Sequence, residues 1–154
     1  MKKAHLLGLR RLKSLNEADV SFVPPLLRRR LSPLQRIFFF LAHFDETLPK
    51  PKRVVFASRD GEDTLTRRTV EDFHADGTAS PHRFSASVYN AAPGLWSVFT
   101  KNTAPYTAVA AGRETVRIGL LEALLPAETP TLFVYAEETD GGHGFSCLYG
   151  FDGD

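Results

Sequence analysis

The chain offers few side chains that could attack a substrate. It contains one cysteine, Cys147, and no Gly-x-Ser-x-Gly motif, the pattern that exposes a nucleophilic serine at a strand-to-helix turn. A single cysteine forms no internal disulfide and builds no cysteine-type zinc site. Because Cys147 lies in an apolar stretch at residues 145–149, we expect it to be a buried small hydrophobe.

Metal and nucleotide chemistry have no support either. The five histidines lack the His-Glu-x-x-His spacing of a zinc site, and no carboxylate is placed to complete a metal triad. The patterns Gly-x-x-x-x-Gly-Lys-Ser/Thr and Gly-x-Gly-x-x-Gly, which hold phosphate groups, are both missing. We therefore expect no metal and no cofactor.

A run of three arginines is the strongest basic feature. Arg28, Arg29 and Arg30 are followed by Arg36, one turn into a predicted helix. Such runs are most often a solvated surface that contributes little energy. The alternative is a docking patch for an acidic carrier protein or its phosphate-bearing arm, because guanidinium groups make charge-assisted contacts with carboxylates and phosphates.

The composition is that of one globular domain spanning residues 1–154. Hydrophobic residues make up 43% of the chain and charged residues 24%, which suits a single core. The formal net charge of +1 gives no general attraction for nucleic acid or anionic lipid. The longest apolar run, at residues 37–42, is far shorter than the roughly 20 residues of a membrane span, and no signal-like segment is present. We expect a cytoplasmic protein.

Strands and helices alternate along the chain. Ser32, Pro33 and Gln35 form a capping-box pattern that predicts a helix from Pro33, and its apolar repeat predicts burial on most sides. Apolar, β-branched runs predict strands at residues 4–12, 53–58, 106–111, 131–136 and 145–151. This order favours an α/β fold with a mixed, mostly buried five-stranded sheet flanked by helices.

The connections between these strands should hold the other helices. Two short helices fit residues 80–102, and a longer helix before them should end at Gly77. The core-facing stripe of that longer helix is predicted to be Thr66, Thr69, Val70 and Phe73. The last helix should end at Pro126, and its inner face is predicted to be Val116, Leu120 and Leu124, with Leu121 and Leu125 beside it.

Four segments resemble the N-terminal half of β-ketoacyl synthases, in the order found in that family. The clearest is residues 80–98, SPHRFSASVYNAAPGLWSV, which is similar to the synthase segment with Ser-Pro, an aromatic residue, Asn-x-Ala-x-Gly and Ser-Ile. Residues 104–125 resemble the strand and helix that carry the synthase nucleophile. Residues 25–32 (PLLRRRLS) and 55–62 (VFASRDGE) resemble short β-ketoacyl-synthase-like N-terminal domains of bacterial clusters for fatty-acid-like and aryl polyene products. The resemblance covers about residues 20–138 and implies one half of a thiolase-like fold.

The resemblance also implies that the nucleophile is missing. Aligned from Ala104 and Pro105 without a gap, the synthase cysteine falls at Arg113, and a register two residues shorter places it at Ala111. Neither side chain can attack a thioester, a step that needs a thiolate. The two active-site histidines of the family belong to a C-terminal half that this sequence lacks. We therefore expect a non-catalytic homologue.

The function implied is that of a chain-length-factor-like accessory protein. It would pair with a β-ketoacyl synthase or contact an acyl carrier protein in bacterial fatty-acid, polyketide or aryl polyene biosynthesis. Pairing in the family uses a strand edge, so a homodimer or heterodimer is expected. The corresponding edge residues are Tyr106, Thr107, Ala108, Val109, Ala110 and Ala111.

Two alternatives stay open. An acyltransferase or thioesterase acting on carrier-bound acyl chains could use Ser85, Ser87 or His82, although such hydroxyls more often cap short helices. A homodimeric binding module could instead hold an acyl chain in a tunnel. The residues predicted to line that tunnel are Phe84, Leu95, Trp96 and Phe99.

Overall fold

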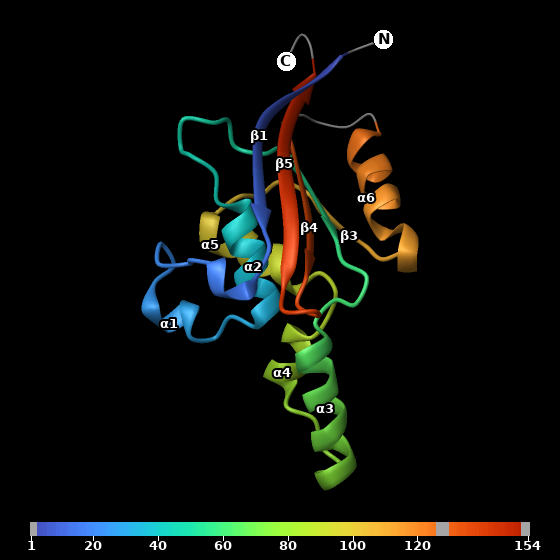
Figure 1. Ribbon diagram of the computed structural model, residues 1–154. Helices are drawn as coiled ribbons and strands as arrows, with labels where there is room; N and C mark the ends of the chain where they lie inside the picture. Colours follow the sequence, from blue (N-terminus) through green and yellow to red (C-terminus); the bar gives the residue numbers. More distant parts are fainter. Residues whose placement is uncertain (1–2, 126–129, 152–154) are drawn as a thin grey trace.

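One five-stranded sheet with helices on both faces forms the body of the protein (Figure 1). The computed structural model describes residues 3–125 and 130–151. Helices α2 (Pro33–Ala42) and α5 (Ala91–Thr100) pack on one face of the sheet, and α6 (Thr115–Leu124) packs on the other. The predicted α/β architecture is confirmed.

The strands lie in the order β1 (Ala4–Leu12), β5 (His143–Phe151), β4 (Thr131–Glu137), β2 (Arg53–Ala57) and β3 (Tyr106–Val109). β5 runs antiparallel to both of its neighbours, while β4, β2 and β3 are parallel to one another. Nearly every residue of β2 and β4 is buried. Burial on both faces explains why these two strands are continuous apolar runs and do not alternate with polar residues.

Helix α2 forms the centre of the main core. The Ser32 hydroxyl accepts the N–H of Gln35, and the Gln35 side chain accepts the N–H of Ser32, so the predicted capping box is confirmed. Phe38 is fully buried and meets Phe56 of β2 edge to face, with ring centroids 5.2 Å apart. This helix holds together α5 and the β1, β5 and β4 side of the sheet.

Helix α6 packs against the sheet through small residues and not mainly through the leucines that the sequence predicted. Gly119 and Ala123 are buried, whereas Leu121 and Leu124 are half exposed. A Cβ at Gly119 would lie 2.7 Å from the Cβ of Ala57, so this approach requires glycine. The predicted inner face was therefore wrong in part, because the side chains that meet the sheet are the smallest and not the most hydrophobic.

Helices α3 (Asp63–Asp76) and α4 (Pro81–Ala86) form an arm that extends from one end of the sheet (Figure 1). As predicted, α3 ends at Gly77, whose φ of 69° makes a left-handed cap. The predicted burial of the α3 stripe was wrong in part, since only Thr69 of its four residues is buried. Val70 and Phe73 are 50% and 56% exposed, because α3 packs mainly against α4 and not against the sheet.

The remaining elements are short. Helix α1 (Pro25–Arg28) and the 3-10 turns η1 (Leu15–Glu17) and η2 (Gly112–Glu114) lie in the connections. Pro126, predicted to end the last helix, is outside the described residues. No helix in the described part of the chain is long and apolar enough to cross a membrane.

Candidate functional site

Strand β3 lies at one edge of the sheet, so half of its backbone groups are left for another strand. The carbonyl oxygens of Pro105 and Val109 accept N–H groups from the β2 side at 3.0 and 3.1 Å. Because successive residues of a strand direct their backbone groups to opposite sides, the N–H and C=O groups of Tyr106 and Ala108 point away from β2. These groups form an open edge that a second strand can use.

The turn from β3 to α6 is where a synthase-like nucleophile would lie. Ala110 and Ala111, predicted to continue the strand, lie in this turn instead. Arg113 is exposed in η2. Thr115 is only 2% exposed. Its hydroxyl accepts a hydrogen bond from the N–H of Ala111 at 3.0 Å and donates one to the carbonyl oxygen of Gly112 at 2.7 Å. The only hydroxyl of residues 110–115 therefore holds the turn in shape.

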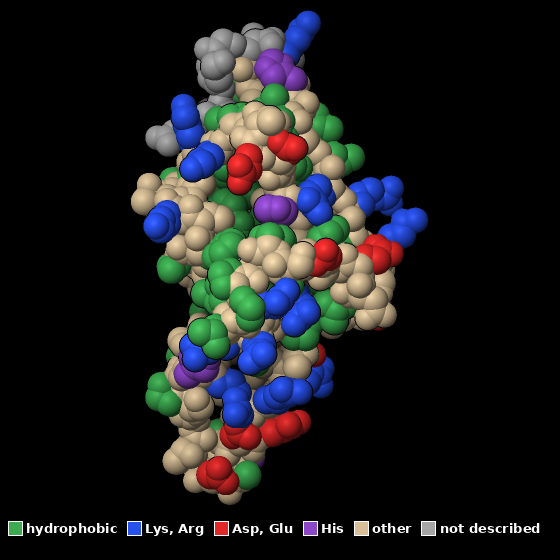
Figure 2. All heavy atoms as spheres, turned by 90° about the vertical axis from the view of Figure 1, so that its left-hand side faces the viewer, with side chains coloured by type: hydrophobic (Ala, Val, Ile, Leu, Met, Phe, Trp, Pro, Cys, Tyr) green, Lys and Arg blue, Asp and Glu red, His purple; other side chains and the backbone are tan. Residues whose placement is uncertain are grey.

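The arginines predicted to dock a carrier protein lie on one surface but differ in exposure. The Arg36 guanidinium donates to the carbonyl oxygen of Arg28 at 3.5 Å, and both side chains are partly buried. Arg29 and Arg30 are exposed. Asp19 lies near Arg28 and offsets part of its charge. Figure 2 shows lysine and arginine side chains gathered on the lower half of this side of the molecule.

The four residues predicted to line an acyl tunnel do not share one cavity. Phe84 lies on α4 and is 60% exposed. Trp96 and Phe99, on α5, line a cavity of about 620 Å³, whereas Leu95 packs against the main core. The prediction of one tunnel was therefore wrong, since α4 and α5 contribute to separate surfaces.

The hydroxyls considered for an acyltransferase or thioesterase are bonded within α4 and its end. Ser85 Oγ donates to the carbonyl oxygen of His82 at 3.0 Å, and Ser87 Oγ donates to that of Phe84 at 2.8 Å. Both hydroxyls are used by the helix backbone, which favours a structural role for these serines.

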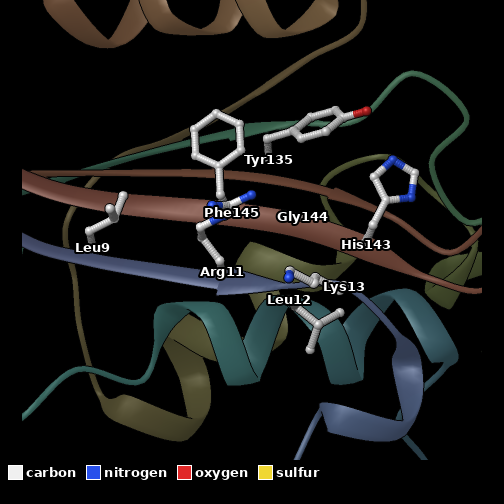
Figure 3. Close-up of a pocket in the computed structure, with 8 residues that line it drawn as sticks. All are labelled: Leu9, Arg11, Leu12, Lys13, Tyr135, His143, Gly144 and Phe145. Atoms are coloured by element: carbon white, nitrogen blue, oxygen red, sulfur yellow. The ribbon is translucent and has the colours of Figure 1, made fainter.

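Helix α6 covers β2, β3 and β4 and leaves much of β1 and β5 open on its face of the sheet. Figure 3 shows Tyr135 and Phe145 on this side of the sheet, beside Leu9 and Arg11, along a hollow of about 620 Å³. Cys147, also on β5, is partly buried, and this burial raises the pKa of its thiol. The thiol thus stays protonated at neutral pH, as expected for a small hydrophobe.

A buried carboxylate at the ends of β2 and β4 was missed by the sequence analysis. Glu137 is 1% exposed and accepts hydrogen bonds from Ser58 Oγ at 3.0 Å and from the backbone N–H groups of Arg59 and Asp60. It therefore shapes the turn that follows β2. A usable signal was present, since Glu137 directly follows the apolar run at residues 131–136, Asp60 lies two residues after the run at 53–58, and the ends of neighbouring parallel strands meet at one edge of the sheet.

Two more carboxyl groups extend this cluster to the start of α3. Glu62, 2% exposed, accepts the Gln35 side-chain amide at 2.9 Å, and Glu138 accepts the N–H of Thr64. The second oxygen of each carboxyl, Oε2, is buried without a hydrogen-bond partner among the described residues. Burial, together with the charge of Glu138, raises the pKa of Glu62 to about 7 against the opposing hydrogen bonds.

The sheet order and the helices on both faces define a thiolase-like fold. A similar solved structure is described as a ketosynthase (ApeO) in complex with its chain length factor (ApeC) from Xenorhabdus doucetiae. The match has a TM-score of 0.81 and 19% sequence identity, and it covers 95% of this chain and 78% of that chain. The family model described as the β-ketoacyl synthase, N-terminal domain, matches residues 8–140, so the chain belongs to that family. A search of curated proteins found no match.

Proposed function

We propose that this chain is a non-catalytic, chain-length-factor-like partner of a ketosynthase in bacterial fatty-acid, polyketide or aryl polyene biosynthesis. The observation that carries the proposal is the turn between β3 and α6. The family resemblance places the nucleophilic cysteine in this turn, where a helix N-terminus lowers the pKa of a thiol. Here the turn carries Ala111, Gly112 and Arg113, and the Thr115 hydroxyl is already bonded on both sides.

Two observations support a ketosynthase as the partner. The similar solved structure is a complex of a ketosynthase with its chain length factor. The open edge of β3 also offers backbone groups to a partner strand, and strands that meet at such an edge continue the sheet across the interface.

The proposal predicts that the purified chain has no condensing activity. Incubated with malonyl carrier protein and an acyl primer, it should release no carbon dioxide and form no β-ketoacyl product, because the turn offers no thiolate. A thiol-directed synthase inhibitor should leave the protein unmodified, since burial raises the pKa of Cys147. A ketosynthase is the positive control, and condensation by this chain alone would overturn the proposal.

The exposed arginines are proposed to contact the acidic surface of a carrier protein. Arg29 and Arg30 are exposed, whereas Arg28 and Arg36 are partly buried and linked by a hydrogen bond. The formal net charge of the whole chain is only +1, so this patch would act locally. Steering of this kind acts mainly on the association rate and weakens as salt rises, because the screening length is about 8 Å at physiological ionic strength.

Changing Arg29 and Arg30 together to glutamate should weaken carrier-protein binding about tenfold or more at low salt and much less at high salt. The thermal midpoint should stay within about 2 °C, because both side chains are exposed. The matched control is Lys52→Glu with Arg68→Glu, the same charge change at other exposed positions. Equal low-salt affinities of the two double variants, measured by calorimetry, would contradict docking at the arginine patch.

The alternative functions have less support. An acyltransferase or thioesterase at Ser85 or Ser87 is disfavoured because both hydroxyls are bonded to the backbone at α4. An acyl-binding module lacks the expected tunnel, because Phe84 is exposed on α4 and does not line the cavity beside Trp96 and Phe99.

A further inference from the structure

The arm formed by α3 and α4 is attached at its base to the body of the protein (Figure 1). Gln35 of α2, only 2% exposed, makes one attachment. Its side-chain amide donates to a carboxyl oxygen of Glu62 at 2.9 Å and to the carbonyl oxygen of Ala86 at 3.4 Å. Glu62 directly precedes α3, and Ala86 is the last residue of α4. One buried side chain of the body therefore holds both helices of the arm.

A second attachment joins the arm to the segment that follows β4. The carboxylate of Glu138 accepts the N–H of Thr64 in the first turn of α3. Farther along, α3 packs mainly against α4, and Arg83 of α4 pairs with Asp72 of α3, which is a contact within the arm. The position of the arm therefore depends on a few polar contacts around Glu62.

Glu62 has surroundings that disfavour a negative charge. It is 2% exposed, and its second carboxyl oxygen has no hydrogen-bond partner among the described residues. The uncharged side chains of Ser32 and Gln35 face it from α2, and the Glu138 carboxylate acts on it from the segment after β4. None of the described lysines, arginines and histidines is among the groups that act on this carboxyl group.

The other charges at this end of the sheet are already used elsewhere. Arg59, in the turn before α3, pairs with Asp60 at 2.8 Å. The Glu137 carboxylate is bonded within the turn that follows β2. A charge on Glu62 would therefore be buried, repelled by Glu138 and without a cation to pair with, whereas a proton on Glu62 removes these costs.

We propose that Glu62 is a pH-sensitive attachment of the arm. With its proton in place, Glu62 stays bonded to Gln35 and the arm stays on the body. When the proton is lost to solvent, the carboxylate turns toward water, because hydration offsets its charge. This movement breaks the bond to Gln35, frees the start of α3 and loosens α4 at Ala86. The arm opens locally while the sheet and α2 stay folded. This inference goes beyond the proposed function, since it uses neither the β3 edge nor the arginine patch.

The pH range of opening follows from the two states of Glu62. Burial raises the pKa of Glu62 to about 7 in the closed arm, and exposure to water returns it toward its ordinary value of 4.5. The open arm therefore binds fewer protons between these values. Opening becomes more favourable as the pH rises to about 7 and changes little above it. Between pH 6 and pH 8.5 the population of the open arm should increase about tenfold.

Hydrogen exchange of the full chain, measured by NMR at single amides, tests this proposal. Protection factors, corrected for the intrinsic effect of pH on exchange, should fall about tenfold from pH 6 to pH 8.5 at Thr64, Thr66 and Phe84, whose N–H groups are bonded in the arm. Amides of residues 37–41 in α2 should stay at least about tenfold better protected at pH 8.5, because the body remains folded. Equal protection in the arm and α2 would indicate global unfolding and overturn the proposal.

Glu62→Gln and Glu71→Gln form a matched pair, because each replaces a carboxylate by a neutral side chain of the same size. Glu62→Gln should keep the protection of the arm at pH 8.5, since glutamine has no proton to lose. Glu71→Gln, at an exposed position on α3, should show the wild-type fall. Gln35→Met removes the donor and should leave the arm poorly protected at both pH values.

Three results overturn the proposal. The first is an arm whose protection in the wild type does not change with pH, and the second is an equal fall in the wild type and Glu62→Gln. The third is recovery of protection at pH 8.5 on addition of magnesium chloride, because a cation and not a proton would then hold the arm. Full protection of the arm in folded Gln35→Met contradicts the attachment through Gln35 and overturns it as well.

Discussion

Replacing Ala108 by proline should abolish pairing through β3 while leaving the fold intact. The N–H of Ala108 points away from β2, so proline removes a group that only a partner strand would use. Proline is tolerated on edge strands when its missing N–H faces outward. The ring also blocks the approach of a second strand. We expect the Kd for the ketosynthase to rise about 100-fold or more, equivalent to roughly 2.7 kcal/mol.

The matched control for this substitution is Ala108→Val, which adds a side chain of similar size and keeps the N–H. It should pair like the wild type, and both variants should melt within a few degrees of it. Analytical ultracentrifugation measures the Kd, and circular dichroism measures the melting temperature. A proline variant that pairs normally would exclude β3 as the interface, while equal weakening by valine would point to packing and not to strand pairing.

Replacing Glu62 by glutamine should stabilise the protein above pH 7 by up to about 3 kcal/mol. Burial raises the pKa of Glu62 to about 7, well above its ordinary value of 4.5. The folded chain therefore binds more protons than the unfolded chain between these values. The contribution of Glu62 is fully present below about pH 4.5 and is lost as pH rises through 7. Glutamine remains neutral at every pH, so it avoids the cost of a buried charge.

Denaturant unfolding between pH 5 and pH 8.5 tests this prediction. The wild type should lose stability from pH 5 to about pH 7 and level off above it, and the Glu62→Gln variant should lose much less. Glu71→Gln, at an exposed position on α3, is the control and should retain the wild-type pH dependence. Parallel pH profiles for the wild type and Glu62→Gln would contradict the prediction. They would show that Glu62 is charged in the folded protein and that other interactions offset the cost of its burial.

Local sequence patterns correctly predicted the helices and strands that other parts of the same chain bury. The capping box at Ser32 indicates a helix, and the continuous apolar runs of β2 and β4 indicate strands covered on both faces. Together they predict a buried helix packed on a buried sheet. The stripe containing Val70 and Phe73 was different. An apolar helix face indicates that something covers it, but the pattern does not say whether the cover is the same chain. The face of α6 depended on close approach at Gly119, which hydrophobicity alone does not encode.

The sequence predicted the part of the candidate site whose residues are consecutive. It did not predict the parts whose residues come from different helices and strands. The β3-to-α6 turn was located because its residues are consecutive, and both candidate nucleophile positions, Ala111 and Arg113, lie in it. Phe84 and Trp96 are twelve residues apart on different helices, so their separation into two surfaces required the structure. Likewise, Glu62 and Glu138 meet only because β2 and β4 are neighbours.

The mass of the assembly formed with a ketosynthase tests the central proposal most directly. Native mass spectrometry of the purified chain mixed with the ketosynthase of its own pathway should show a species containing one copy of each protein. The Ala108→Pro variant should be absent from that species under the same conditions. The account is contradicted if the chain keeps its own mass at every ratio and the ketosynthase forms only assemblies with itself.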